Sequence, residues 1–277
     1  MKVPIIYFSS SGNTKYVCQV VAKGLNSMDL ETELIPLRGI KKHPSRIKDA
    51  ALFGIGAPIY GANFTPNMIQ WMKQLPRVND DKKFFLIDTC SGLSGVALLK
   101  ARTILTQKGY KCVGGLELIS PTRDSVFWTG FYDYISWNED EIKRAYNFGR
   151  LVAKNYWAGK EKFIKSFRVM PFGRILTKLF TYVERPFFKL ATKLMAIDHS
   201  KCKRCKLCES LCPMEAINVK QDIYFHPEKC MLCFKCMRNC PEGALYLKIY
   251  PKAKFFKGPF QIKGYIEPEK LNFRKVE

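Results

Sequence analysis

The C-terminal part of the chain contains the stretch Cys202-Lys-Arg-Cys205-Lys-Leu-Cys208-Glu-Ser-Leu-Cys212-Pro213. The same spacing returns 28 residues later, as Cys230-Met-Leu-Cys233-Phe-Lys-Cys236-Met-Arg-Asn-Cys240-Pro241. Both runs follow the pattern C-x2-C-x2-C-x3-C-P, and the residues after them also correspond. This segment is therefore an internal repeat, and it holds eight of the eleven cysteines of the chain.

The spacing of these cysteines has a chemical reason. Three of them wrap a tight loop around one face of an iron–sulfur cubane, because its irons favour soft thiolate ligands. The fourth, followed by proline, points across to a second cluster. The sequence therefore predicts two [4Fe–4S] clusters with crossed ligands. One cluster takes Cys202, Cys205, Cys208 and Cys240, and the other takes Cys230, Cys233, Cys236 and Cys212.

The alternative is a pair of four-cysteine zinc sites. Zinc usually takes two separate C-x2-C knuckles, and it leaves the Cys-Pro endings unexplained. Residues 198–248 closely resemble bacterial-type two-cluster ferredoxins, although Lys206 and Phe234 stand where such proteins often have glycine. The resemblance favours the iron–sulfur interpretation.

The N-terminal part begins with an apolar run, Val3 to Phe8, which leads into the hydroxyl-rich loop Ser9-Ser-Ser-Gly-Asn-Thr14. A helical pattern with apolar positions at Val17, Val20, Val21 and Leu25 follows. A strand, a loop and a helix N-terminus together favour an anion, because free backbone N–H groups and the helix dipole point at it. The loop is neither G-x-G-x-x-G nor a Walker loop, which argues against NAD and ATP here.

Strand and helix patterns continue to alternate up to Trp157. Strands are expected at 33–37, 49–56, 84–88 and 112–119, and helices at 65–75, 96–108 and 139–157. This series predicts an α/β doubly wound, parallel five-stranded sheet, with ligands at the carboxyl ends of its strands. The loops after the first, third and fourth strands leave the same edge.

These three loops resemble those of flavodoxins, which bind FMN. The resemblance covers about residues 1–157 and implies that the doubly wound sheet is flavodoxin-like. It implies that the first loop binds the FMN phosphate and that the other two flank the isoalloxazine, with Tyr60 a candidate for stacking. The implied FMN residues are Ser9, Ser10, Ser11, Gly12, Asn13, Thr14, Pro58, Ile59, Tyr60, Gly61, Thr89, Cys90, Ser91, Gly92 and Gly95. The aromatic loop 120–137 is expected to cover the ring.

Composition points to a soluble, intracellular protein. Hydrophobic residues make up 47% of the 277-residue chain, no secretory signal is visible, and no apolar run reaches the ~20 residues of a membrane span. The formal net charge is +22, and cluster thiolates and a flavin phosphate would lower it to about +16. A surface this basic suits acidic redox proteins, such as ferredoxins or an oxidoreductase. Nucleic acid is not expected, because no matching motif accompanies the charge.

Three units follow: a flavodoxin-like FMN domain (1–157), a basic amphipathic connector (158–197), and a two-[4Fe–4S] ferredoxin domain with a basic C-terminal arm (198–277). The connector has nine Lys or Arg and two acidic residues. It either packs its apolar face between the two domains, which we favour, or lies on an anionic membrane surface.

The halves together resemble the flavodoxin–ferredoxin fusion flavoproteins of anaerobes. The resemblance implies a cytoplasmic electron-transfer protein that passes electrons between two clusters, FMN and external partners. One alternative is a flavin-dependent reductase fed by the clusters, although no substrate-specific catalytic residue is visible. The other is a redox-sensing or docking protein.

Overall fold

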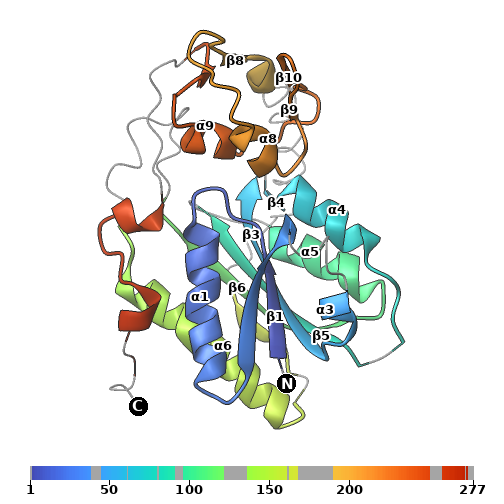
Figure 1. Cartoon of the computed structure of the whole chain (residues 1–277). Helices are drawn as coiled ribbons and strands as arrows, with labels where there is room; N and C mark the ends of the chain where they lie inside the picture. The colour runs from blue at the N-terminus through green and yellow to red at the C-terminus, as the bar shows by residue number, and fades with distance from the viewer. Residues whose placement is uncertain are drawn as a thin grey trace.

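The computed structural model describes residues 2–38, 45–60, 62–79, 81–90, 96–121, 136–160, 162–167, 190–249, 258–271 and 273. These residues form two stacked modules (Figure 1). The N-terminal module is built on a twisted sheet, and the smaller C-terminal module, residues 190–249, lies beyond one edge of that sheet.

The sheet of the N-terminal module has the strand order β2-β1-β3-β5-β6-β7, and β4 pairs with β3. All neighbours in this order are parallel, whereas β4 is antiparallel to β3. The five strands from β2 to β6 have the doubly wound order that reverses between β1 and β3, so the predicted fold class is confirmed. The strands are β1 (Lys2–Tyr7), β2 (Glu31–Pro36), β3 (Leu52–Tyr60), β4 (Asn63–Phe64), β5 (Lys83–Cys90), β6 (Lys111–Ile119) and β7 (Ile164–Ser166).

The sheet has two more strands than the five predicted from the sequence. β7 comes from the connector and pairs with β6, which would otherwise expose an open edge. Gly114 and Gly115 of β6 leave room for β7 and for Phe167, which follows it. A Cβ atom on Gly114 would lie 3.3 Å from Ile164, and one on Gly115 would lie 3.1 Å from Phe167. Of the connector, residues 168–189 lie outside the described part.

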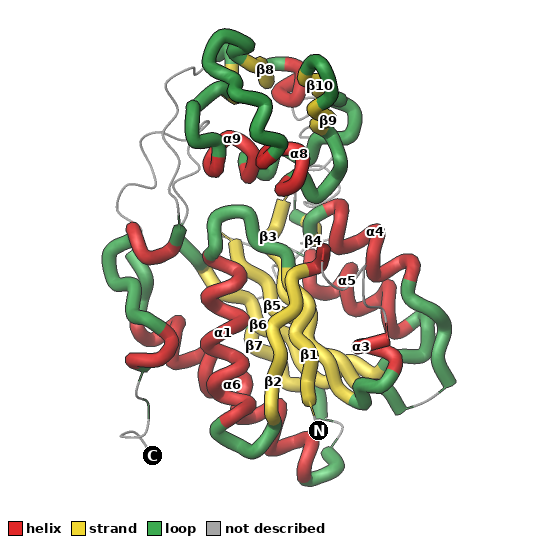
Figure 2. The backbone as a smooth tube through the Cα atoms, viewed as in Figure 1, coloured by secondary structure: helices red, strands yellow, loops and turns green. Residues whose placement is uncertain are grey.

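Helices cover both faces of this sheet (Figure 2). α1 and α6 pack on one face, where Ile5 of β1 points, and α4 and α5 pack on the other, with Ile6. α1 and α6 meet at a glycine notch, because a Cβ atom on Gly149 would lie only 2.2 Å from the Val21 carbonyl. The helices are α1 (Asn13–Asn26), α3 (Ser45–Lys48), α4 (Pro66–Gln74), α5 (Ala97–Thr106) and α6 (Glu139–Trp157).

The C-terminal module repeats one unit twice around a small apolar core. β8 pairs with β11 and β9 pairs with β10, both antiparallel. Because β8 belongs to this pairing, the module begins before the expected boundary at residue 198. Its elements are β8 (Met195–Ile197), α8 (Leu207–Leu211), β9 (Ile217–Val219), β10 (Ile223–Phe225), α9 (Lys235–Asn239) and β11 (Leu245–Leu247).

The C-terminal arm returns to the N-terminal module. It contains two short 3-10 helices, η1 (Pro259–Gln261) and η2 (Pro268–Lys270). Lys23 of α1 donates to the carbonyl oxygen of Pro268 at 2.8 Å, and the rings of Tyr16 and Tyr265 lie 4.8 Å apart. Among residues 258–271 and 273 of the arm, Tyr265, Ile266 and Phe273 therefore pack with the N-terminal module. Among the described helices, none has both the length and the apolar character needed to cross a bilayer.

Candidate metal and cofactor sites

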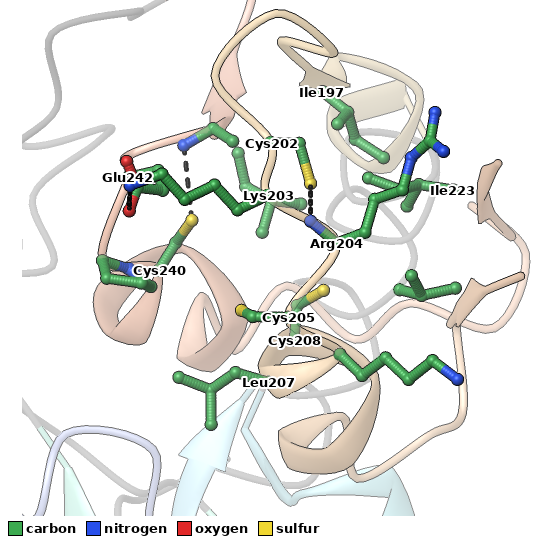
Figure 3. Close-up of a pocket in the computed structure, with 15 residues that line it drawn as sticks. Ile197, Cys202, Lys203, Arg204, Cys205, Leu207, Cys208, Ile223, Cys240 and Glu242 are labelled. Carbon is green, nitrogen blue, oxygen red and sulfur yellow. Dashed lines mark hydrogen bonds and ion pairs between the residues drawn. The ribbon is translucent and has the colours of Figure 1, made fainter. Parts of the chain in front are cut away.

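Four predicted ligands surround one pocket of the C-terminal module. Cys202, Cys205 and Cys208 come from the first repeat, and Cys240 comes from the end of α9 in the second (Figure 3). Val219, Ile223 and Leu245 supply apolar walls. The cavity, part of which is open to solvent, has a volume of about 440 Å³. We call it the outer pocket.

A second pocket repeats this arrangement with the other four cysteines. Cys230, Cys233 and Cys236 come from the second repeat, and Cys212 comes from the end of α8 in the first. Its volume is about 350 Å³, and Met195, Ile217 and Phe225 lie in its wall. We call it the inner pocket. The structure thus brings the eight predicted ligands together in two groups of four, each with one cysteine from the opposite repeat.

The backbone around both pockets is arranged to hold sulfur. In each repeat two amide groups donate to cysteine Sγ atoms: Arg204 to Cys202 (3.3 Å), Ala216 to Cys212 (3.2 Å), Leu232 to Cys230 (3.4 Å) and Ala244 to Cys240 (3.3 Å). These donors suit thiolates that carry charge. The loops reach this geometry through left-handed residues: Arg204, Lys206 and Glu215 in the first repeat, and Leu232, Phe234 and Gly243 in the second.

The position before each short helix has a left-handed backbone, and in both repeats it holds a residue other than glycine. Lys206 has φ 61° at the N-cap of α8, and Phe234 has φ 53° at the N-cap of α9. Glycine adopts this conformation freely, whereas other residues are strained in it. Lys206 and Phe234 therefore hold this conformation at some cost in strain.

Burial sets the protonation of the inner thiols. It raises the pKa of Cys230 to about 11 and that of Cys233 to about 12, and it also raises the pKa of Cys208 in the outer pocket. A metal must displace these protons on binding, because the ligand is the thiolate. Four converging thiols in an apolar pocket with amide donors fit an iron–sulfur cluster.

The carboxyl edge of the sheet carries the second candidate site. Gly12, with φ 95°, ends the first loop, and its amide donates to the Ser9 hydroxyl at 3.0 Å. No side chain caps α1, so the first-turn N–H groups of this helix remain available to an anion. Hydroxyl groups and a bare helix N-terminus are donors without a full charge, and they fit a phosphate group.

Hydrogen bonds tie this loop to the neighbouring strand ends. The hydroxyls of Thr14 and Thr89 lie 2.8 Å apart, and those of Ser10 and Tyr60 lie 3.0 Å apart. The side-chain amide of Asn13 donates to the carbonyl of Pro121, so it faces the end of β6. The ends of β1, β3 and β5 therefore meet at one place, as the doubly wound fold requires.

The structure also differs from expectation at this edge. Pro58, Ile59 and Tyr60, expected in a loop, are the last residues of β3, because Asn63 and Phe64 turn back to pair with Ile59 and Tyr60. Trp137, expected to cover the ligand, packs in the core with its ring 4.7 Å from that of Tyr16. Thr89 and Cys90 end β5 and are buried. Gly61, Ser91, Gly92, Gly95 and residues 122–135 lie outside the described residues.

The two candidate sites meet where the modules join. The guanidinium Nη1 of Arg238 donates to the Ser10 carbonyl at 3.0 Å, and the Lys235 ammonium lies 5.9 Å from the centre of the Phe8 ring. Cys233 belongs to an apolar core of the N-terminal module, and Met231, Ile59 and Tyr60 pack against that core. Sequence reasoning missed this junction, because one arginine in a basic chain gives no signal of its partner.

Comparison with known proteins finds a matching family in each module. Residues 4–93 match the family described as flavodoxin domain, and residues 193–244 match the family described as 4Fe-4S dicluster domain. The chain is a flavodoxin–ferredoxin fusion. Its C-terminal module belongs to the ferredoxins, since a ferredoxin of Methanothermococcus thermolithotrophicus is 33% identical over 58 residues, which cover 20% of this chain and 97% of that protein.

Further relatives match part of the chain. A flavodoxin of Clostridium saccharobutylicum is 27% identical over 158 residues, which cover 55% of this chain and 96% of the relative. An uncharacterised protein of Methanocaldococcus jannaschii is 34% identical over 84 residues, and the match spans only 30% of each chain. Among solved structures, a flavodoxin from the domain Archaea covers 56% of this chain and 98% of its own, with a TM-score of 0.43 and 18% identity.

Proposed function

We propose that this electron-transfer protein carries two [4Fe–4S] clusters and one FMN, arranged as a wire. The order is external partner, outer pocket, inner pocket, flavin site. One observation carries this proposal: residues of the inner pocket, Met231 and Cys233, pack on the flavodoxin core, whereas Cys205 of the outer pocket is exposed.

The residues of each pocket have a clear part in such a wire. Clusters supply one-electron steps, and FMN joins one- and two-electron chemistry. The thiols of the outer pocket (Cys202, Cys205, Cys208, Cys240) and of the inner pocket (Cys230, Cys233, Cys236, Cys212) hold the irons. The amide donors to Sγ and the apolar walls adjust the potentials, because hydrogen bonds to sulfur and exclusion of water are the levers that proteins use.

The flavin site would use the edge of the flavodoxin sheet. The loop from Ser9 to Thr14 would bind the phosphate, and the segment from Pro58 to Gly61 would line one side of the isoalloxazine. Thr89 and the residues that follow it would line the other side. The hydroxyl contacts between Thr14 and Thr89 and between Ser10 and Tyr60 support this assignment, because they bring the three segments together.

The external partner is proposed to be an acidic redox protein in the cytoplasm. The support is the formal charge of +22 and the basic residues around the outer pocket, Lys203, Arg204 and Lys206. Opposite charges raise association rates by steering the encounter.

The test is anaerobic reconstitution of the full chain with iron, sulfide and FMN. We expect about eight irons and one FMN per chain, since each cubane holds four irons. Zinc bound in place of iron, iron well below this content, or failure to retain FMN would overturn the proposal. Reduction of the bound FMN by a reduced acidic ferredoxin, followed by absorbance, then tests the direction of transfer.

A further inference from the structure

A buried arginine of the ferredoxin module lies against the phosphate loop of the flavodoxin module. Arg238 stands on α9, its guanidinium donates to the Ser10 carbonyl at 3.0 Å, and only 7% of the residue is exposed. Ser10 belongs to the loop assigned above to the FMN phosphate. The arginine therefore reaches from one cofactor module into the other.

The internal repeat shows that cluster binding does not require this arginine. The equivalent residue in the first repeat, 28 positions earlier, is Ser210. Ser210 is exposed, and its hydroxyl bonds the Leu207 carbonyl of its own helix at 2.9 Å. Both residues follow the third cysteine of their run by two positions, so the difference between them concerns the junction and not the cluster.

The charge of Arg238 has an electrostatic cost in this position. A buried cation loses hydration, and phosphate oxygens are acceptors that suit a guanidinium. Lys235, also on α9, places a second cation over Phe8 next to the same loop. The uncapped N-terminus of α1 adds the positive end of a helix dipole. Positive charge from two modules thus converges on one loop, and a bound phosphate dianion would neutralise it.

We propose that Arg238 is an FMN-phosphate-binding residue that the ferredoxin module supplies to the flavodoxin site. The inference rests on the proposed function, because it requires FMN at this edge. It follows that FMN binding and docking of the inner pocket beside the flavin stabilise each other, since a coupling between two sites is reciprocal. The chain then holds its flavin fully only when the two modules are in contact.

The test compares two flavins on cluster-loaded protein from which FMN has been removed. FMN and riboflavin, which lacks the phosphate, are titrated into wild type, Arg238→Met, Arg238→Lys and a control, Lys220→Met, by flavin fluorescence. Lys220 is exposed in the turn between β9 and β10, so the control removes the same charge from the same module.

We expect Arg238→Met to weaken FMN binding by about tenfold or more, as for the loss of a charge-assisted hydrogen bond. Riboflavin binding should stay within about twofold, and Arg238→Lys should recover most of the FMN affinity because it keeps the charge. Lys220→Met should change neither. Iron content and far-ultraviolet circular dichroism of each variant report whether it is folded and loaded.

Two outcomes would overturn this inference and leave the proposed function intact. Equal weakening of both flavins by Arg238→Met would make Arg238 a docking residue with no role toward the phosphate. Unchanged FMN affinity in a variant with full iron content would remove any role. A wild type that retains iron but binds neither flavin would instead overturn the proposed function, and this inference with it.

Discussion

The two ferredoxin repeats have one backbone and two different surfaces. Left-handed residues, short helices and amide donors to sulfur recur at positions 28 residues apart. The side chains at these positions differ: Lys203, Arg204 and Lys206 of the first repeat correspond to Met231, Leu232 and Phe234 of the second. The first three are exposed, whereas Leu232 and Phe234 are buried and Met231 is partly buried against the flavodoxin core.

The difference between these side chains indicates which end of the ferredoxin module faces which partner. The loop geometry that holds a cluster is independent of the side chains that point away from it, so each repeat can keep its cysteines and change its surroundings. Basic residues give the outer pocket an exposed charged rim, and apolar residues give the inner pocket a dry contact with the flavodoxin edge. These surfaces would give the proposed wire a charged outer end and a buried inner end.

Loss of Cys212 or Cys240 should remove the cluster that is built mainly from the opposite repeat. We expect Cys240→Ala and Cys202→Ala each to lose the outer cluster. Likewise, Cys212→Ala and Cys230→Ala should each lose the inner cluster. Each variant should keep about half of the iron, because each pocket holds four of the eight thiols. Electron paramagnetic resonance of the reduced proteins checks the pairing: a Cys240→Ala spectrum that matches Cys230→Ala would contradict crossed ligation.

The order of the pockets predicts unequal effects on the flavin. Reduction of FMN by an external reduced ferredoxin should be nearly abolished in Cys230→Ala and slowed less in Cys202→Ala, because Met231 and Cys233 of the inner pocket pack on the flavodoxin core. Cys230 is the inner-pocket cysteine chosen for substitution because it packs in the ferredoxin core. Cys233, by contrast, lies at the junction between the modules. Stopped-flow absorbance measures the rates. Equal rates, or the opposite order, would show that electrons do not pass through the inner pocket last.

The equivalent left-handed positions should respond to glycine with opposite signs. Lys206→Gly removes an exposed side chain and relieves strain, so we expect a gain of up to about 1 kcal/mol in unfolding free energy. Phe234→Gly relieves the same strain but removes a ring that is only 7% exposed, and we expect a net loss of about 2–4 kcal/mol. Anaerobic thermal loss of cluster absorbance measures both. Stabilisation by Phe234→Gly would show that strain outweighs packing there.

Most of the fold could be predicted from the sequence because its signals are local. The pattern from Glu139 to Trp157 predicted a helix, and α6 has these bounds. The cysteine spacing of the repeat led to groups of four, and the two pockets contain these groups. In both cases residues near in sequence, or related by a repeat, carry the information.

The features that were missed depend on partners distant in sequence or on short pairings. β7 is three residues long and exists because β6 offers an edge with glycines at 114 and 115. The end of β3 is extended because Asn63 and Phe64 pair with it. Arg238 contacts a carbonyl 228 positions away, and its identity alone does not show which loop it meets.

The smallest expected effect concerns the charged rim of the outer pocket. Lys203 pairs with Glu242 at 2.9 Å, and this hydrogen bond raises the pKa of the lysine, which therefore stays charged at neutral pH. Its side chain is 73% exposed, so Lys203→Gln should leave stability nearly unchanged. The association rate with an acidic ferredoxin should fall about two- to threefold at low salt and converge with wild type at high salt, because screening removes steering. Lys154→Gln, with the same charge change at an exposed position on α6 of the other module, should have a smaller effect. An equal effect of both variants would mean that net charge, and not the rim of the outer pocket, attracts the partner.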